Sequence, residues 1–233
     1  MLRAILFDFN GVLVDDEPFH LELFQKVLEE EGLELTQEDY YSKYLGLDDK
    51  GCFAEVLHQA GRTVDVGYLM RLITRKASYY EALIRQKGYP FFPGAIDLVR
   101  EVGKAGLMLG IVSGALREEV EGALRQGKIE DLFKLLVTAE DVLASKPDPQ
   151  GYQLGLEGLN SIPPLPDRLI HPHEVLVIED SPAGVEAAQA LGLPTLAVAQ
   201  SYPKKELAMA DAVAPSLAKL KLSEVLELYS AIP

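Results

Sequence analysis

The stretch from Ile5 to Asp15, ILFDFNGVLVD, constrains the fold more than any other part of this 233-residue chain. Its apolar run is typical of a strand buried on both faces, and it ends abruptly in Asp8 and Asn10. The carboxyl end of a buried parallel strand opens into a binding crevice in α/β proteins. We therefore expect Asp8 to lie in a reactive site. Asn10 is the unusual neighbour, because an amide cannot transfer protons as a carboxylic acid can.

The charge balance excludes several classes of partner. The chain has 22 Lys and Arg against 36 Asp and Glu, a formal net charge of -14, which repels nucleic acids and anionic lipid surfaces. No segment approaches the roughly 18 to 20 apolar residues of a membrane span, and the first residues lack a signal-peptide pattern. The single cysteine, Cys52, excludes an internal disulfide and is interpreted as a packing residue. We expect a soluble cytoplasmic protein with neither nucleic-acid nor membrane partners.

Residues 17–90 have the pattern of a helical block placed directly after the first strand. Apolar side chains recur at helical spacing over residues 18–31, and Gly32 ends that pattern. Thr36 and Asp39 match a capping box, which predicts another helix start. Further helices are expected over residues 51–60 and about 65–87, and no strand pattern appears between residues 17 and 90. The sequence therefore predicts an all-helical second domain over residues 17–90.

From Pro93 onward, short apolar runs alternate with amphipathic stretches. Strands are expected over residues 107–112, 135–138, 175–178 and 195–199. Helices are expected over residues 93–104, 116–126, 150–158, 204–209 and 223–229, with one more beginning at Ser181-Pro182. This alternation predicts an α/β fold with a doubly wound parallel sheet, formed by residues 1–16 and 91–233.

Residues 160–173 form a connection that contains two histidines and four prolines. His171-Pro172-His173 resembles a metal-binding sequence. The flanking segments supply no further ligands nearby, so an exposed loop stiffened by proline is the favoured interpretation.

Polar groups follow four of the expected strands or loops, where parallel strands bring them to one edge of the sheet. They are Asp8 with Asn10, Ser113, Lys146, and Glu179 with Asp180. A carboxylate nucleophile, a hydroxyl, an ammonium group and an acidic pair are what phosphoryl transfer through an aspartyl-phosphate needs. Each group alone would be weak support, whereas the set favours this chemistry.

These stretches resemble the four motifs of the haloacid dehalogenase superfamily, most of whose members are phosphatases and phosphomutases. The motifs are Asp8-Phe9-Asn10-Gly11-Val12, Val112-Ser113-Gly114, Lys146-Pro147-Asp148-Pro149 and Glu179-Asp180-Ser181-Pro182-Ala183-Gly184. They occur in the family's order over residues 8–184. The helical insertion is similar to the cap of the subgroup that includes β-phosphoglucomutase and phosphoglycolate phosphatase. The resemblance implies a Rossmann-like core with an inserted, mobile helical cap.

The resemblance also implies a role for each matched residue. Asp8 would attack phosphorus and form a covalent acyl-phosphate. Ser113 and the backbone amide of Gly114 would hold phosphate oxygens, while Lys146 would neutralise the nucleophile and the phosphoryl group.

The implied cofactor is Mg²⁺, an ion that prefers oxygen ligands. Its implied ligands are the Asp8 carboxylate, the backbone carbonyl of Asn10, Asp180, and Glu179 either directly or through water. Without the other motifs, Glu179 and Asp180 would be equally well explained as an acidic pair that favours a helix N-terminus.

Asn10 departs from the family pattern, in which the matching aspartate protonates the leaving oxygen and later activates water. Loss of such a group typically costs about 10² to 10⁴ in rate. Metal binding through the backbone carbonyl of residue 10 would survive. Asp15, Asp16 or His20 at the junction to the insertion are alternative proton donors, although packing at the hinge is the favoured interpretation of His20. Asn10-Gly11 is also a deamidation-prone pair, which would regenerate an aspartate.

The insertion is expected to choose the substrate. The loop over residues 44–50 is placed like the family's specificity loop, and Lys50 and Lys76 could meet a second anionic or hydroxyl group of a sugar phosphate. His20 matches a histidine in β-phosphoglucomutase-like proteins, and Arg117 follows Ser113 closely. For both lysines, a solvated surface position is the equally favoured alternative.

Three functions are compatible with this sequence. The first is a Mg²⁺-dependent phosphatase that acts on a small phosphorylated metabolite, slowed by Asn10. The second is a β-phosphoglucomutase-like sugar phosphomutase, and the third is a catalytically weakened protein that binds a phosphorylated ligand. Dehalogenation is the least favoured, because it needs neither the acidic pair nor the metal. We expect a monomer or a small homo-oligomer.

Overall fold

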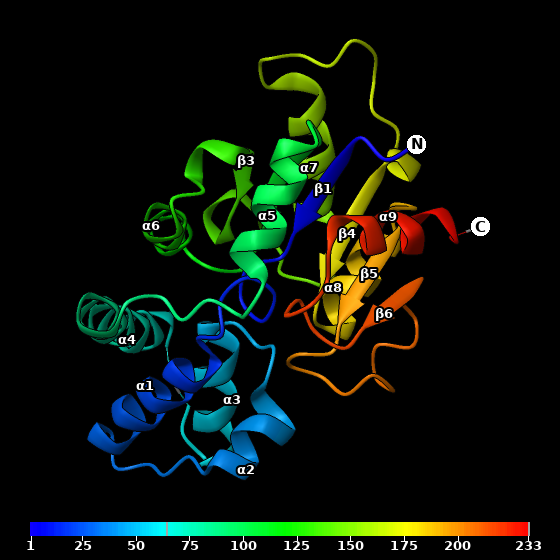
Figure 1. The fold of residues 1–233 in the computed structure, drawn as a ribbon. Coiled ribbons are helices and arrows are strands. Elements are labelled where there is room, and N and C mark those ends of the chain that lie inside the picture. Colours follow the sequence, from blue (N-terminus) through cyan, green and yellow to red (C-terminus); the bar gives the residue numbers. More distant parts are fainter. Residues whose placement is uncertain (64, 233) are drawn as a thin grey trace. The chain divides into compact units, whose positions relative to one another are not determined.

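The computed structural model describes residues 1–63 and 65–232, and the chain divides into two compact units. The core unit consists of Met1–Asp15 and Phe91–Pro233, and the inserted unit consists of Asp16–Pro90 (Figure 1). Among the described residues, none of the helices combines the length and the apolar character needed to cross a bilayer. Each unit is described separately below.

A six-stranded sheet forms the centre of the core unit, in the order β3-β2-β1-β4-β5-β6 with every neighbouring pair parallel. Its strands are β1 (Ala4–Phe7), β2 (Met108–Val112), β3 (Phe133–Val137), β4 (Val175–Glu179), β5 (Thr195–Val198) and β6 (Ala212–Ala214). Phe7 of β1 is in register with Ile111 of β2 and Ile178 of β4, so the three strands end together. The predicted doubly wound parallel sheet is confirmed.

Helices lie on both sides of this sheet (Figure 1). They are α5 (Ala95–Lys104), α6 (Arg117–Gly127), α7 (Gln150–Ser161), α8 (Pro182–Gln189) and α9 (Leu222–Ser230), with single 3₁₀ turns at Glu130–Leu132, Ala139–Asp141 and Pro172–Glu174. Tyr152 of α7 and Ala188 of α8 pack into one cluster with Leu6 and Val177. All four residues of β1 are buried, because neighbouring strands and helices cover both faces. Asp8 therefore follows a strand that is buried along its whole length.

The inserted unit contains only helices among its described residues: α1 (Glu17–Glu30), α2 (Gln37–Asp39), a π-helical turn at Tyr40–Tyr44, α3 (Asp49–Gln59) and α4 (Val66–Lys87). The helix start predicted at Thr36 is present: Thr36 Oγ1 accepts a hydrogen bond from the Asp39 amide at 3.0 Å and caps α2. The Asp39 carboxylate accepts from the Thr36 hydroxyl at 2.9 Å, whereas in a capping box it would accept from the Thr36 amide. Cys52 lies in the apolar cluster of this unit, and burial raises the pKa of its thiol to about 12. Cys52 is thus the packing residue that the sequence suggested.

In the C-terminal third, one expected helix is absent and one strand was missed. Residues 204–209 form turns instead of a helix, because burial of Leu207 against Val185 and Ala197 fixes the chain more strongly than helix propensity. The strand β6 was not expected, because its three residues lack a strand pattern, yet it pairs in register with β5. Tertiary contacts override the local signal in both places.

The connection between α7 and β4 is held by an ion pair between the exposed Arg168 and the buried Glu174. The Arg168 guanidinium donates to both carboxylate oxygens of Glu174, at 2.8 and 2.6 Å, and the His171 amide donates to Oε2 at 3.1 Å. Glu174 is only 3% exposed. The hydrogen bonds from Arg168 and from the His171 amide lower the pKa of Glu174 to about 2. The conformation of the proline-rich connection is therefore fixed by this ion pair as well as by the proline rings.

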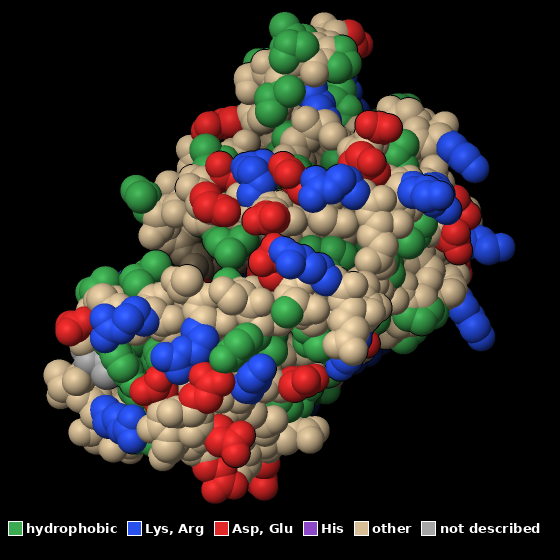
Figure 2. Space-filling view, turned by 90° about the vertical axis from the view of Figure 1, so that its left-hand side faces the viewer, with side chains coloured by type: hydrophobic (Ala, Val, Ile, Leu, Met, Phe, Trp, Pro, Cys, Tyr) green, Lys and Arg blue, Asp and Glu red, His purple; other side chains and the backbone are tan. Residues whose placement is uncertain are grey.

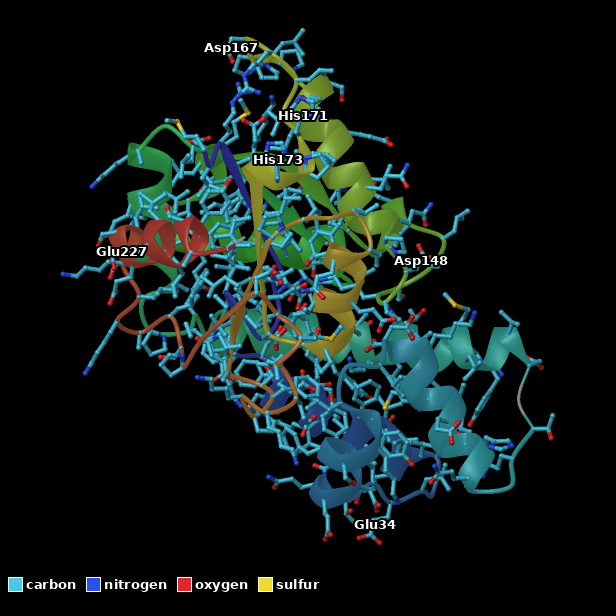
Figure 3. All side chains as sticks on the ribbon, turned by 90° about the vertical axis from the view of Figure 1, so that its right-hand side faces the viewer. Glu34, Asp148, Asp167, His171, His173 and Glu227 are labelled. Carbon is cyan, nitrogen blue, oxygen red and sulfur yellow. The ribbon has the colours of Figure 1, made fainter. Side chains whose placement is uncertain are left out.

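Replacing Glu174 by glutamine should destabilise the protein in a pH-dependent way. Because folding lowers the pKa of Glu174 from 4.5 to about 2, its stabilisation is complete above pH 4.5 and disappears as the pH falls toward 2. The loss of melting temperature should be largest near neutral pH and should shrink in acid. Glu227→Gln, on the exposed face of α9, is the matched control (Figure 3). Equal losses at all pH values would contradict the assignment.

Candidate active site

Asp8 lies at the carboxyl end of β1 and is 7% exposed. Its backbone amide donates to the Ile178 carbonyl at 2.9 Å, which extends the pairing with β4 by one residue. The strand order reverses here, since β1 is flanked by β2 on one side and β4 on the other. Ligands of open parallel sheets bind at such a switch point.

Lys146 links the ends of three strands through its ammonium group. The Nζ atom donates to Asp8 Oδ1 at 2.5 Å, to Glu179 Oε1 at 2.6 Å and to the Val112 carbonyl at 3.1 Å. These three acceptors match the three N–H bonds of an ammonium group. Lys146 is therefore fixed against Asp8 by the protein itself.

The carboxylate of Glu179 accepts five hydrogen bonds. Lys146 and the Tyr152 hydroxyl, at 2.8 Å, donate to Oε1. The amides of Asp180 and Ser181 donate to Oε2 at 2.9 and 3.1 Å, and the Ser181 hydroxyl adds a bond of 3.0 Å. The Ser181 hydroxyl also accepts from the Gly184 amide at 3.1 Å and caps α8, as the sequence predicted. Glu179 is fully satisfied within the protein.

Two glycines allow the acidic groups to approach the backbone. A Cβ atom on Gly184 would lie 1.8 Å from Glu179 Oε1, and one on Gly11 would lie 1.9 Å from Asp180 Oδ2. Gly11 also has a φ angle of +77°, which disfavours any side chain. Asp180 in turn is hydrogen bonded to Ser201. Glycine is therefore required beside both acidic residues.

Negative charge exceeds positive charge in this cluster. Burial raises the pKa of Asp8 to about 7; Lys146 opposes this rise and Glu179 adds to it. Burial, Glu179 and Asp8 together raise the pKa of Asp180 well above its ordinary value. Burial acts the same way on Glu179, but Lys146, Tyr152 and Ser181 outweigh it and lower its pKa. Three ligand oxygens, one from each carboxylate, lie within 4.8 Å of one another. A group of carboxylate oxygens with excess negative charge fits a hard divalent cation such as Mg²⁺.

The phosphate-binding candidates follow β2. The Ser113 hydroxyl accepts from the Ala115 amide at 3.0 Å and donates to Asn10 Oδ1 at 3.5 Å. Asn10 is half-buried and Gly114 is exposed. The structure therefore brings Asn10, Ser113 and Gly114 to the same edge of the sheet as Asp8.

Arg117 is directed elsewhere within the core unit. Its guanidinium pairs with Asp141 at 2.6 Å and donates to the Leu136 carbonyl at 3.3 Å. Its backbone amide donates to the Glu140 carboxylate. Arg117 thus holds the 3₁₀ turn that follows β3.

The inserted unit contains a buried polar cluster around Lys76, which is 2% exposed. Lys76 Nζ donates to Asp49 Oδ1 at 2.5 Å and to His20 Nδ1 at 2.8 Å. The other ring nitrogen, Nε2, lies 3.4 Å from Asp16 Oδ2, and the His20 ring stacks on Tyr80 with centroids 5.1 Å apart. The alternative of a solvated surface lysine is therefore wrong for Lys76.

Lys50 differs from Lys76, because it lies exposed in the first turn of α3. Most other basic side chains of the inserted unit stand beside a carboxylate or an aromatic ring of the same unit. Figure 2 likewise shows basic and acidic groups interleaved on the face that it displays. For Lys50, both sequence-based alternatives, a substrate contact and a solvated surface lysine, therefore stay open.

Three residues beside the site were missed from the sequence. Tyr152 is completely buried, binds Glu179 and has its ring 5.0 Å from Lys146 Nζ. Gln200 Nε2 donates to the Gly11 carbonyl at 2.7 Å, and Ser201 binds Asp180. Gln200 and Ser201 follow β5, so the rule that located Asp8 would also have located them. A tyrosine on a buried helix face needs a hydroxyl partner, which was the available signal for Tyr152.

The two histidines of the proline-rich connection lie away from this site. His171 and His173 stack with ring centroids 5.7 Å apart (Figure 3). They precede β4, whereas Glu179 ends it, so the two histidines lie at the amino ends of the strands and the site lies at the carboxyl ends. They are part of the connection closed by Glu174.

Comparisons with known proteins agree with this geometry. Residues 5–198 match the model of the family described as haloacid dehalogenase-like hydrolase. The validoxylamine A 7'-phosphate phosphatase of Streptomyces hygroscopicus subsp. limoneus is 27% identical over 95% of this chain and 97% of its own length.

Solved structures support the same conclusion. CbbY from Rhodobacter sphaeroides in complex with phosphate superposes with a TM-score of 0.83 and is 25% identical, over 96% of this chain and 99% of its own. The β-phosphoglucomutase from Clostridium difficile has the same fold, with a TM-score of 0.84 and 22% identity over 99% and 98% of the two chains. Motifs, sheet order and family match agree, and the chain belongs to the haloacid dehalogenase-like hydrolase family.

Proposed function

We propose that this protein is a Mg²⁺-dependent phosphatase that hydrolyses a small phosphorylated metabolite through an aspartyl-phosphate on Asp8. The observation that carries the proposal is the buried group of Asp8, Lys146, Glu179 and Asp180 at the switch point of the sheet. The phosphatase activity of the Streptomyces relative and the phosphate bound by CbbY support it.

The proposed metal ligands are Asp8, Asp180, the backbone carbonyl of Asn10, and Glu179. Because Glu179 already accepts five hydrogen bonds, its contact with the ion would run through water. The bound ion would screen the repulsion between the carboxylates and the phosphate.

In the proposed first step, a carboxylate oxygen of Asp8 bonds to phosphorus while the bond from phosphorus to the leaving oxygen breaks. Lys146 holds Asp8 in place and balances charge, and the Ser113 hydroxyl and the Gly114 amide donate to phosphoryl oxygens. Water then attacks phosphorus, which releases inorganic phosphate and restores the Asp8 carboxylate. Asn10 orients the leaving oxygen but supplies no proton, so both steps are slow for ordinary esters.

We further propose that residues 17–90 act as a cap that selects the substrate, while residues 1–16 and 91–233 carry the chemistry. Lys50 is the proposed contact to the non-reacting part of the substrate. His20 and Lys76 would contribute by holding the hinge end of α1 and the start of α3 through their cluster.

Phosphate release from a panel of phosphorylated metabolites tests this function. We expect slow release with Mg²⁺, none after removal of the metal with a chelator, and recovery when Mg²⁺ is returned. Isomerisation that depends on a bisphosphate, without free phosphate, would instead identify a mutase. Tight ligand binding without release from any compound would identify a binding protein.

A further inference from the structure

The side chains around Asp8 that could donate a proton determine which phosphoryl compounds this site can cleave. Cleavage of an alkyl phosphate leaves an alkoxide, which must take up a proton as the bond to phosphorus breaks. A positioned acid typically accelerates such a step by about 10² to 10⁴. The question is therefore which side chain could hold that proton.

Lys146 and Glu179 cannot supply it without dismantling the site. All three N–H bonds of Lys146 are used by Asp8, Glu179 and the Val112 carbonyl. Glu179 accepts five hydrogen bonds, and a proton on either oxygen would displace one of these donors. The Tyr152 hydroxyl is buried and donates to Glu179. These groups hold the nucleophile and are not proton donors to a ligand.

The groups nearer to the ligand side are weak donors by their chemical nature. The Asn10 amide can donate a hydrogen bond but not a proton. The Ser113 hydroxyl is a weak acid that already accepts from the Ala115 amide. Asn10 and Ser113 thus present an amide and a hydroxyl where an acid would be needed. Of the remaining acidic groups, Asp180 is a proposed metal ligand whose carboxylate is hydrogen bonded to Ser201, and Asp15 is tested below.

His20, the candidate proton donor from the inserted unit, also has partners for both of its ring nitrogens. Its Nδ1 accepts from Lys76 at 2.8 Å and its Nε2 faces Asp16 at 3.4 Å. Asp16 is completely buried and accepts from the Tyr80 hydroxyl at 2.6 Å. The ring would have to leave both partners to serve a substrate.

We infer that this enzyme is specialised for phosphoryl compounds whose leaving group departs as a stable anion, namely acyl phosphates and other phosphoanhydrides. The inference rests on the proposed phosphatase function. With an acyl phosphate, Asp8 bonds to phosphorus and the P–O bond breaks, so the substrate carboxylate leaves without a proton. In the second step, water adds hydroxide to phosphorus and its remaining proton passes to a phosphoryl oxygen. Both steps balance without a general acid.

The test measures kcat/KM for acetyl phosphate, a series of aryl phosphates of graded leaving-group acidity, and glucose 6-phosphate. For the wild type, kcat/KM should fall steeply as the leaving group becomes more basic. Asn10→Asp should flatten this dependence. It should raise kcat/KM for glucose 6-phosphate by about 10² to 10⁴ and change that for acetyl phosphate only a few fold. Leu143→Asp adds the same charge at a side chain that is 97% exposed, and it should leave the slope unchanged.

Two results would overturn the inference. One is a wild-type slope as shallow as that of Asn10→Asp, and the other is a steeper slope in Asp15→Asn, which would identify Asp15 as the acid. Failure of the proposed function looks different, because no compound would then release phosphate with either the wild type or Asn10→Asp. Peptide mass analysis before each assay verifies that residue 10 is still asparagine, so that deamidation does not imitate the acid.

Discussion

Replacing Asp8 by asparagine is expected to abolish phosphate release and, at the same time, to stabilise the metal-free protein. Loss of a catalytic nucleophile typically costs about 10⁴ to 10⁶ in kcat. The amide oxygen of the variant can still accept from Lys146, so the local geometry should survive. Mass analysis after incubation with acetyl phosphate should show one added phosphoryl group on the wild type and none on the variant.

The gain in stability follows from the pKa of Asp8. Folding raises it from 3.8 to about 7, so the folded protein holds this proton more tightly than the unfolded chain. The resulting destabilisation is absent in acid, grows as the pH rises from 3.8 toward 7, and is complete above that. Asparagine has no such charge. The melting temperature of the Asp8→Asn protein should therefore exceed that of the wild type by several degrees at alkaline pH. One kcal/mol of stability corresponds to about 2–4 °C for a chain of this size.

Mg²⁺ should reverse the order of the two proteins. The ion binds only the folded wild type well, and binding to the native state raises its stability. Melting curves with a chelator and with Mg²⁺ therefore give opposite signs for the difference. An Asp8→Asn protein that is less stable than the wild type without metal would contradict the proposed charge excess.

Replacing Gly184 by alanine should lower the activity by displacing Glu179. The new Cβ would overlap Glu179 Oε1 at 1.8 Å, so the carboxylate must move away from Lys146 and Tyr152. Displacements of this size cost about 10²-fold in rate, and overpacking typically costs about 1–3 kcal/mol. We expect both losses, measured as kcat and as the urea midpoint of unfolding.

Gly158→Ala in α7 is the matched control for this change. Its Cβ would meet the ends of two flexible side chains, Leu135 at 3.1 Å and Ile162 at 3.5 Å, and alanine favours a helix over glycine by about 1 kcal/mol. Its stability and kcat should stay close to those of the wild type. Normal turnover in Gly184→Ala would show that the position of Glu179 does not matter for catalysis.

Sequence patterns were sufficient wherever one rule of burial decided the structure. Residues 65–87 were expected as a helix and form α4 over Val66–Lys87, because apolar side chains recur at helical spacing. The placement of Asp8, Lys146, Glu179 and Asp180 at one edge followed from parallel strands ending together. The same reasoning failed for residues 204–209, where burial of Leu207 outweighs helix propensity.

Pairing partners were harder to predict than positions. Lys76 and Arg117 both have sequences typical of exposed cations, yet one is buried with Asp49 and His20 and the other pairs with Asp141. Such partners come from distant segments and leave no periodic signal. For the same reason, the hydroxyl of Tyr152 could not be assigned to Glu179 before the fold was known.

The five hydrogen bonds on Glu179 have a consequence for the thermodynamics of ligand binding. A flexible carboxylate and lysine would each lose rotamer freedom when a ligand arrives, at about 0.5–1.5 kcal/mol per side chain. Glu179, Lys146 and Tyr152 have already lost theirs in the folded chain. Folding therefore bears the ordering entropy of this cluster, and the affinity for a phosphoryl group is not reduced by it.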